Sequence, residues 1–448
     1  MQANPFRVMH TADLHLESGY SHGNVDKEGG LNSRFTDFAD TWLQVCGRAV
    51  HEGVDLLVFA GDLARTREPS PTALRAFAAG LRLATDALIP ALIVLGNHDT
   101  AASPGRASAL DIFHDPSRGV YVSGRPELLT LRPKDPDDGR LLLCEATPSR
   151  IASDRGAPLI ATLPAVPRSF AAAQDADGLS RDELDARIAR GLMETARGLY
   201  AQAAVADRQE LREGLTRGPR ILVAHHTVSG AATSTEQATT FFGEPVLPLA
   251  DLKEIGFDAI MLGHIHRRQA LGTTGTPTVY CGSPERVDFG EAGEEKTVAL
   301  WAFERHPAAP FGPVSVEYIP TQARPFITIR LQDDPVFDGA PTIPAPELAQ
   351  DFTGAVVRLI YKGEADHAAR IDRAGIVRQL AGYGAVKVVG PEVELVRPAL
   401  IRDAALADAA GPLEALTRYL DGKLIEGPDR EKLLAALGKL IEEQEGVV

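Results

Sequence analysis

The sequence predicts an α/β fold, and three observations lead to this prediction. First, short apolar runs recur through the first 300 of the 448 residues. Second, amphipathic stretches with helical spacing, such as residues 35–51 and 71–84, separate several of these runs. Third, five of the runs end in a cluster of polar residues. Apolar runs of about four to eight residues that alternate with helices are typical of buried strands in a sheet that helices cover.

The expected elements follow one another along the chain. Residues 180–214 carry apolar side chains at helical spacing, and Ser180 with Glu183 offers a capping box, which predicts a long helix. A charged stretch at 412–445 is interrupted at Gly427–Pro428, where a helix cannot readily continue, so it predicts two short helices. The expected strands of the first 300 residues are Phe6–Met9, Asp55–Ala60, Ala91–Leu95, Leu141–Cys144, Ile221–Ala224 and Asp258–Leu262.

Two proline-rich segments, at 307–313 and 335–346, punctuate the C-terminal third of the chain. Residues 326–331 and 355–361 lie between and after these segments, and their alternating character is typical of strands. They predict a smaller α+β domain. We therefore expect a large domain over residues 1–312, a smaller domain over 313–402 and a helical segment over 403–448.

The composition excludes several classes of protein. A formal net charge of −15 argues against a protein that coats nucleic acid by bulk charge, but it is compatible with a site rich in metal-binding carboxylates. The three cysteines show no CxxC spacing, which argues against a disulfide framework and a structural zinc site. The apolar run at 87–95 is too short to span a bilayer, and the N-terminus lacks the apolar core of a secretory signal. We expect a cytoplasmic protein.

Five polar clusters follow apolar runs, and together they predict a two-metal centre. If the runs are strands, the clusters lie at strand carboxyl ends, where open α/β folds place their sites. Carboxylates, an amide oxygen and imidazoles suit Mn²⁺, Fe or Zn²⁺. Asp62 is the natural bridge, because one carboxylate can place an oxygen between two cations. The clusters are His10-Thr-Ala-Asp13-Leu-His15, Gly61-Asp62, Gly96-Asn97-His98-Asp99, His225-His226 and Gly263-His264-Ile265-His266.

Each cluster alone also has an ordinary structural explanation. Asp13 and His15 could belong to a polar loop, Gly61-Asp62 is a common turn, and His225-His226 could be one buried and one solvated histidine. The occurrence of all five clusters, in this order, favours the metal centre.

The order of these motifs resembles the calcineurin-like metallophosphoesterase superfamily over residues 5–300. The resemblance implies a four-layer α-β-β-α sandwich. It also implies that Asp62 bridges two divalent cations. His98 would be the general acid or a transition-state stabiliser at the leaving oxygen, oriented by Asp99. His225 is preferred over His226 because the apolar run ends immediately before it. The remaining implied ligands are Asp13, His15 and His266 for one cation, and Asn97, His225 and His264 for the other.

The opening Met9–Ser18 and the segment Tyr280–Glu291 resemble SbcD-type DNA repair exonucleases. This resemblance implies a Mn²⁺-dependent DNA exonuclease and endonuclease whose smaller domain caps the active site and contacts DNA. It further implies that a C-terminal helical segment, here 412–445, docks on an SbcC-type ABC ATPase. The related nucleases often act as homodimers. The residues that contact DNA stay unassigned, although Arg65 and Arg67 follow Gly61-Asp62 and could reach phosphates.

Four alternatives stay open on the sequence alone. The metal centre could act on a small phosphodiester such as a cyclic nucleotide, or the chain could be a scaffold that couples an ATPase to DNA. Segment 284–291 is expected to support the loop of His264 and His266 and the strand after it, or else to form an acidic surface loop. The helices of 412–445 could also pack on their own domain.

Overall fold

The computed structural model describes two compact units of the chain, residues 1–361 with 370–392 and residues 362–369 with 393–448. Both expected boundaries, at 312/313 and at 402/403, lie outside the described residues and stay predictions. The residues that the structure does not describe are 1–4, 18–19, 26–29, 102–104, 134–140, 155, 168–178, 213–216, 234–243, 305–313, 335, 337–338, 397–410, 423–426 and 446–448.

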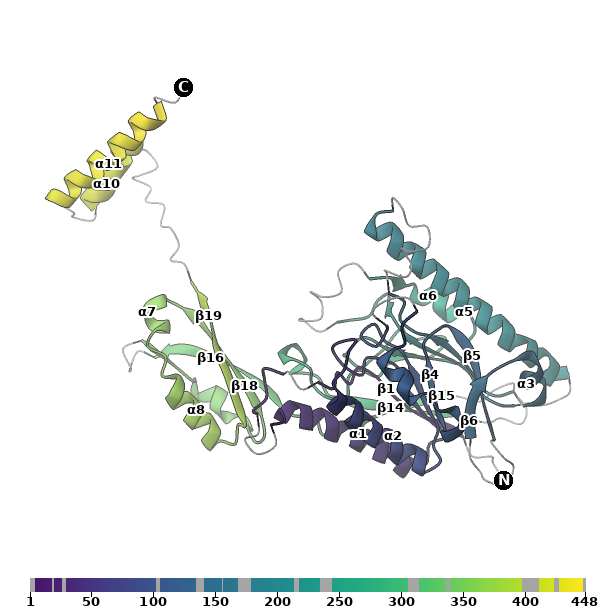
Figure 1. Ribbon diagram of the computed structural model, residues 1–448. Helices are drawn as coiled ribbons and strands as arrows, with labels where there is room; N and C mark the ends of the chain where they lie inside the picture. Colours follow the sequence, from purple (N-terminus) through teal and green to yellow (C-terminus); the bar gives the residue numbers. More distant parts are fainter. Residues whose placement is uncertain are drawn as a thin grey trace. The chain divides into compact units, whose positions relative to one another are not determined.

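The first sheet has six strands in the order β15-β14-β1-β2-β3-β4 (Figure 1). The four strands β1 to β4 run parallel, as expected for apolar runs that helices connect. Strand β14 pairs antiparallel with β1 and brings a later part of the chain back to the start. The strands are β1 (Phe6–Thr11), β2 (Leu56–Phe59), β3 (Ala91–Val94), β4 (Val120–Ser123), β14 (Thr297–Phe303) and β15 (Val314–Pro320).

The second sheet has seven strands in the order β12-β13-β11-β8-β7-β5-β6. Its central strands β13, β11, β8 and β7 are parallel. A separate parallel pair joins β9 (Thr227–Val228) and β10 (Val246–Leu247). The strands of the large sheet are β5 (Glu127–Pro133), β6 (Leu141–Glu145), β7 (Leu159–Leu163), β8 (Arg220–His225), β11 (Ala259–Gly263), β12 (Gln269–Ala270) and β13 (Thr278–Tyr280).

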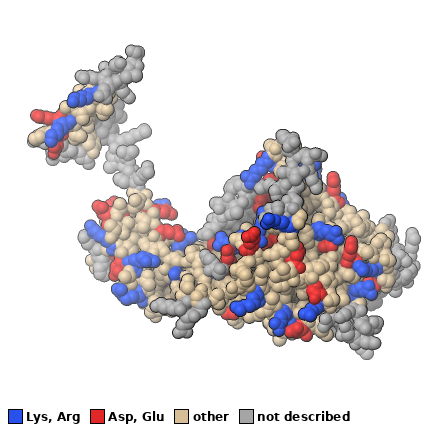
Figure 2. Space-filling model, in the orientation of Figure 1, with Lys and Arg blue, Asp and Glu red and all other residues tan. Residues whose placement is uncertain are grey.

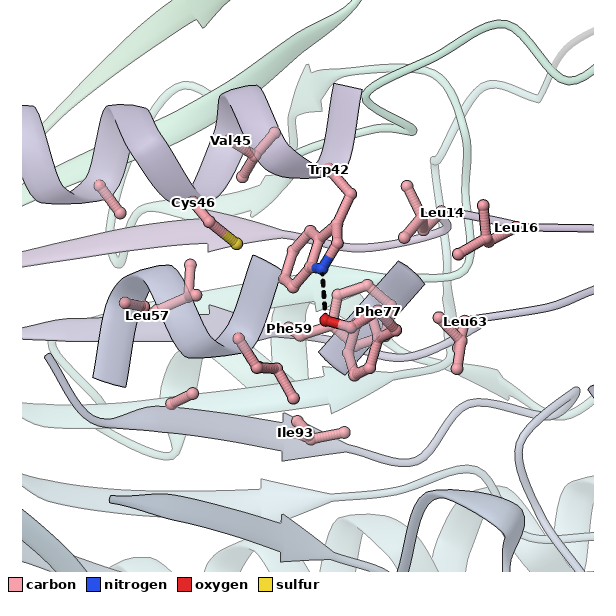
Figure 3. Close-up of a cluster of buried hydrophobic side chains, with 14 of the residues drawn as sticks. Leu14, Leu16, Trp42, Val45, Cys46, Leu57, Phe59, Leu63, Phe77 and Ile93 are labelled. Carbon is pink, nitrogen blue, oxygen red and sulfur yellow. Dashed lines mark hydrogen bonds between the residues drawn. The ribbon is translucent and has the colours of Figure 1, made fainter. Parts of the chain in front are cut away.

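Helices cover the outer face of each sheet. On the first sheet, α1 (Ser33–Glu52) and α2 (Pro71–Asp86) contribute the stacked rings of Trp42 and Phe77, and the Trp42 indole donates to the Phe77 carbonyl oxygen at 2.9 Å (Figure 3). On the second sheet, α5 (Arg181–Arg212) buries a stripe of apolar residues with α3 (Pro148–Ser153) and α6 (Leu249–Glu254) nearby. Short 3₁₀ helices are formed by Ala109–Phe113, Pro116–Arg118, Phe289–Glu291 and Ala345–Ala349.

A third apolar cluster fills the space between the two sheets, with Val58, Val94, Val223, Met261 and Trp301 among its members. The structure therefore confirms the predicted four-layer α-β-β-α sandwich, in which two packed sheets lie between two layers of helices. All six expected strands of the first 300 residues form, and the expected long helix is α5. The capping box is also present, since the Glu183 carboxylate accepts the Ser180 N–H at 2.8 Å.

The C-terminal third contains the expected further elements. A four-stranded sheet has the order β17-β16-β18-β19. The two expected terminal helices are α10 (Pro412–Gly422) and α11 (Pro428–Glu445). No helix in the described part of the chain has the length and apolarity to cross a membrane. The remaining elements are β16 (Phe326–Asp334), β17 (Ala340–Thr342), β18 (Val356–Gly363), β19 (Lys387–Leu395), α7 (Ala365–Ala368) and α8 (Arg373–Gly382).

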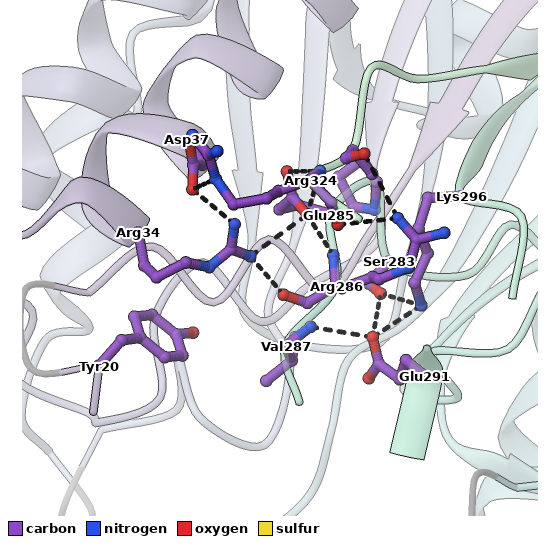
Figure 4. Close-up of polar contacts among 12 residues, drawn as sticks. Tyr20, Arg34, Asp37, Ser283, Glu285, Arg286, Val287, Glu291, Lys296 and Arg324 are labelled. Atoms are coloured by element: carbon purple, nitrogen blue, oxygen red, sulfur yellow. Dashed lines mark hydrogen bonds and ion pairs between the residues drawn. The ribbon is translucent and has the colours of Figure 1, made fainter. Parts of the chain in front are cut away.

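Within the first unit, a charged network joins α1 to the residues before β16 (Figure 4). The Arg34 side chain is only 1% exposed, and it pairs with Asp37 at 2.6 Å and with Glu285 at 3.2 Å. Asp37 also pairs with Arg324, whose backbone N–H donates to Glu285. The network therefore holds three segments that are far apart in the sequence.

Candidate metal centre

The predicted ligands come together where strands of both sheets end. Asp13 and His15 follow β1, Asp62 follows β2 and Asn97 follows β3, all in the first sheet. The second sheet supplies His225 from the end of β8 and the residues after β11, which are His264 and His266. The two packed sheets are thus both needed to assemble the site.

The backbone is strained at four of these residues. Asp13, His15, Asp62 and His264 have φ values of 54°, 47°, 61° and 98°, in the left-handed region that L-residues rarely adopt. Among the described non-glycine residues only Leu88 shares this feature. Each such residue costs on the order of 1–3 kcal/mol, and such strain persists where the surroundings hold it, typically at functional sites.

Close packing between the strand-end loops holds this strained backbone. The Asp13 N–H donates to the Gly61 carbonyl at 2.8 Å, and the His15 N–H donates to the Asp62 carbonyl at 3.1 Å. A Cβ atom at Gly61 would lie 2.4 Å from Nδ1 of His225, so only glycine fits between these loops.

Asp13, His15 and His266 form one group of buried donors, whose ligand atoms all lie within 4.8 Å of one another. The two imidazoles meet at their Nε2 atoms, 2.8 Å apart. The Asp13 carboxylate accepts the backbone N–H of His264 with both oxygens at 3.0 Å. One carboxylate and two imidazoles are the donors that Mn²⁺, Fe and Zn²⁺ accept.

Asp62, His225 and His264 form the second buried group, again within 4.8 Å. The amide oxygen of Asn97 lies 3.0 Å from Nε2 of His225 and 3.1 Å from Nδ1 of His264. Asp62 Oδ2 lies 3.3 Å from Nε2 of His225 and 4.0 Å from Nε2 of His15. One carboxylate oxygen therefore faces both groups, as a bridging ligand would.

Of the two adjacent histidines, His225 enters the centre. Its Nδ1 lies 2.6 Å from the carbonyl oxygen of Ala60, so Nδ1 donates, and Nε2, which faces Asp62, is the nitrogen that a cation can use. The ring of His226 is turned elsewhere, with Nε2 at 3.0 Å from the Pro164 carbonyl. The geometry favours His225, the preferred alternative of the sequence analysis.

Two carboxylates that the sequence did not single out contact the ligand histidines. Glu291 Oε1 lies 2.6 Å from Nδ1 of His266, and Glu244 Oε2 lies 2.8 Å from Nε2 of His264. Glu291 belongs to the Tyr280–Glu291 segment, so the expectation that this segment supports the histidine loop is confirmed. Nothing in the sequence indicated a role for Glu244, because this residue belongs to no recognisable motif.

Asp99 has a role that the sequence did not indicate. Its carboxylate accepts the backbone N–H groups of Asp62, Leu63 and Gly96, at 2.7, 2.9 and 2.9 Å, and so connects two of the strand-end loops. Among the described residues no hydrogen bond joins Asp99 to the ring of His98, so the expectation that Asp99 orients this ring stays a prediction. His98 instead donates its backbone N–H to Asp62 Oδ1 at 2.9 Å.

The electrostatics of the centre suit cations. Burial raises the pKa of Asp13, and burial together with the nearby Asp62 charge raises the pKa of Asp99 to about 6. Burial opposes ionisation of His225, but the Asp62 carboxylate outweighs it and raises the pKa of His225 to about 10. Buried carboxylates thus need positive charge beside them, and the oxygen and nitrogen donors present fit two divalent cations.

A family model and two curated relatives match this chain. Residues 6–161 match the family model described as calcineurin-like phosphoesterase. The chain contains a calcineurin-like phosphoesterase domain. The SbcD component of the nuclease SbcCD from Bacillus subtilis is 26% identical over 66% of this chain and 65% of its own length. The DNA double-strand break repair protein Mre11 of Haloferax volcanii is 28% identical over 64% of this chain and 47% of its own length.

The chain thus spans less than two thirds of the length of these relatives. Among solved structures, a dimetal phosphatase from Danio rerio aligns over 70% of this chain and 99% of its own, with 11% identity and a TM-score of 0.36.

A cavity of about 480 Å³ lies beside the second donor group. Asn97, His98 and His264 form its polar side together with Glu244, and Arg67 contributes a cation. Pro167 and its neighbours form an apolar wall. The cavity therefore joins the candidate metal centre to solvent and leaves room for a substrate next to His98.

Proposed function

We propose that this protein is a metal-dependent DNA nuclease, which hydrolyses phosphodiester bonds with two divalent cations. The observation that carries the proposal is the position of Asp62 Oδ2, within 3.3 Å of His225 and 4.0 Å of His15, between two complete donor groups. Seven ligands from two sheets converge there without a thiolate. Such a donor set is typical of two-metal phosphoesterase sites.

In the proposed mechanism, Asp62 would hold both cations. One cation would also be held by Asp13, His15 and His266. The other would also be held by Asn97, His225 and His264. Two bound cations would supply an activated water and would stabilise the charge of an in-line displacement. His98 lines the cavity beside Asn97 and, as general acid, would donate a proton to the leaving oxygen. Asp99 would keep the loops of Asp62 and Asn97 in register through its three backbone contacts.

DNA is the proposed substrate because the curated relatives are a nuclease component and a DNA double-strand break repair protein. On the face shown in Figure 2, acidic and basic side chains are interspersed, so bulk charge does not supply the affinity. DNA would instead be bound by contacts near the metal centre, among them a contact with Arg67 at the cavity, rather than by an extended basic surface.

We further propose Mn²⁺ as the cation and an SbcC-type ABC ATPase as the partner, which the C-terminal helices would contact. Mixed oxygen and imidazole donors suit Mn²⁺. Helices α10 and α11 expose Leu413, Tyr419, Leu433 and Leu440, which a partner could cover.

The test is hydrolysis of end-labelled linear duplex DNA by the purified protein with Mn²⁺. Controls contain EDTA, or the His98→Ala variant. A cyclic nucleotide and bis-(p-nitrophenyl) phosphate are assayed in parallel. We expect Mn²⁺-dependent shortening of DNA that the variant lacks. Turnover of the small diesters with DNA left intact, even after addition of the ATPase partner, would refute the nuclease and favour a small-substrate phosphodiesterase.

A further inference from the structure

A buried ion pair lies directly behind the first donor group. Glu291 and Lys296 have side chains that are 0% and 1% exposed, and Lys296 Nζ lies 2.7 Å from Glu291 Oε2. The second oxygen of the same carboxylate, Oε1, faces Nδ1 of His266 at 2.6 Å. Figure 4 shows the pair beside Ser283 and Val287. An ion pair this deep in a protein is often no more stable than an apolar pair, so stability alone does not explain its presence.

The pair holds both the side chain and the main chain of His266. Glu291 accepts from the imidazole, and Lys296 donates to the carbonyl oxygen of His266 at 3.3 Å. Glu291 is itself fixed by the backbone N–H of Val287 at 2.9 Å, and Lys296 by the hydroxyl of Ser283 at 2.8 Å. The ring of His266 therefore has little freedom to rotate or shift.

The contact with Glu291 also decides which nitrogen of His266 can bind a cation. A carboxylate only accepts hydrogen bonds, so Nδ1 of His266 carries a proton, and in the neutral ring Nε2 carries the lone pair. The other imidazole of the group differs, because Nδ1 of His15 is buried without a hydrogen-bond partner among the described residues. With the two Nε2 atoms 2.8 Å apart, a neutral His266 accepts the Nε2–H of His15 in the metal-free protein.

We propose that Glu291 and Lys296 are a positioning pair, which presents Nε2 of His266 as a preformed ligand while His15 adapts when the cation binds. This inference rests on the two-metal centre of the proposed function. It assigns different roles to two histidines that the motif alone treats as equivalent. Hydrogen-bond partners behind a ligand histidine fix its orientation and contribute about 10- to 100-fold to metal affinity.

The test measures Mn²⁺ binding without DNA. The double variant Glu291→Met with Lys296→Met removes both buried charges together, so it should fold, but it leaves His266 without its acceptor. We expect calorimetry to show two Mn²⁺ ions for the wild type and a loss of about 10- to 100-fold in affinity at one of them for the variant. Electron paramagnetic resonance should show a coupled Mn²⁺ pair in the wild type and a mononuclear signal in the variant at the same Mn²⁺ concentration.

Glu294→Gln is the matched control. Glu294 also pairs with Lys296, at 2.9 Å, but Lys296 keeps Glu291 in this variant, and Mn²⁺ affinity should stay at the wild-type value. Glu291→Gln, which keeps an acceptor oxygen, should recover part of the affinity. Two tightly bound Mn²⁺ ions in the folded double variant would overturn the positioning role. Fewer than two ions in the wild type would instead refute the metal centre and with it the proposed function.

A second measurement needs no variant. In ¹⁵N nuclear magnetic resonance of the metal-free wild type, the imidazole nitrogens report which atom carries the proton. We expect the proton on Nδ1 for His266 and on Nε2 for His15. The opposite assignment for His266 would overturn the proposal even if the double variant failed to fold.

Discussion

Nε2 of His15 and Nε2 of His266 lie 2.8 Å apart, although 251 residues separate the two histidines in the sequence. Only one of the two atoms can carry the shared proton, so a cation that displaces it gains both lone pairs at once. Metal binding should therefore stabilise the packing of the two sheets that supply these side chains.

The first prediction is that Mn²⁺ raises the melting temperature and EDTA lowers it. A ligand that binds only the folded state, at a free concentration of about 100 times its dissociation constant, stabilises the folded protein by about 2.7 kcal/mol per site. Differential scanning calorimetry measures the shift. Asp62→Asn should lose most of it, because Asp62 Oδ2 faces both donor groups. An equal shift in that variant would show that Mn²⁺ binds elsewhere.

The second prediction concerns His98. His98→Ala should lower kcat for DNA cleavage by about 10²- to 10⁴-fold, the usual contribution of a general acid. Both cations should stay bound, because His98 reaches Asp62 through its backbone N–H, which alanine retains. Metal content by mass spectrometry checks this. The exposed His51 provides the control, and His51→Ala should cleave normally. Loss of both metals from His98→Ala would contradict the assignment.

The third prediction is that His10 makes the folded protein less stable at acidic pH. Both ring nitrogens of His10 are buried without partners among the described residues, and burial lowers its pKa from 6.5 to about 3. Between pH 6.5 and about pH 3, His10 is protonated in the unfolded chain but not in the folded chain. His10 therefore does not reduce the free energy of unfolding above pH 6.5, and it reduces this free energy as the pH drops below 6.5. At pH 5 this loss amounts to about 2 kcal/mol.

His10→Phe should remove this loss, because phenylalanine gives up no hydrogen bond and can still pack near Trp301. Urea unfolding at pH 7 and pH 5 measures it for the wild type, His10→Phe and the surface variant His51→Gln. If the free energy of unfolding depends on pH in the same way for the wild type and for His10→Phe, protonation of His10 does not destabilise the fold.

The fourth prediction compares two arginines on α1. Arg34→Ala should destabilise the protein by about 3–5 kcal/mol, because Glu285 is 1% exposed and loses its buried partner. Arg48 lies on the same helix and pairs with Glu52, but its side chain is 44% exposed. Arg48→Ala should cost no more than about 1 kcal/mol. Similar urea midpoints for the two variants would mean that the Arg34 network adds nothing to stability.

The fifth prediction tests the partner contact. Leu433 and Leu440 on α11 are 47% and 59% exposed. Leu433→Lys with Leu440→Lys should leave Mn²⁺-dependent cleavage of short DNA unchanged and abolish its ATP-dependent stimulation by the SbcC-type partner. Lys432→Ala with Lys439→Ala is the control on the same helix. Normal stimulation of the leucine variant would refute docking through this surface.

The sequence predicted the strands and the candidate ligands because both depend on local patterns. A buried strand needs an apolar run, and a strand-end ligand needs a polar residue directly after it, so Asp62 and His225 could be found by reading along the chain. Contacts between distant segments leave no such pattern. Glu244 reaches His264 from a stretch with no motif, and Asp99 faces backbone donors that only the packed loops bring together.

The centre draws its ligands from residues as far apart as Asp13 and His266, and Glu291 lies behind the last of them. On the ribosome, the first carboxylate emerges long before the last histidine. A nascent or truncated chain that ends before His264 therefore lacks a candidate ligand of each proposed cation site. In the proposed nuclease, the order of synthesis itself would keep unfinished copies inactive.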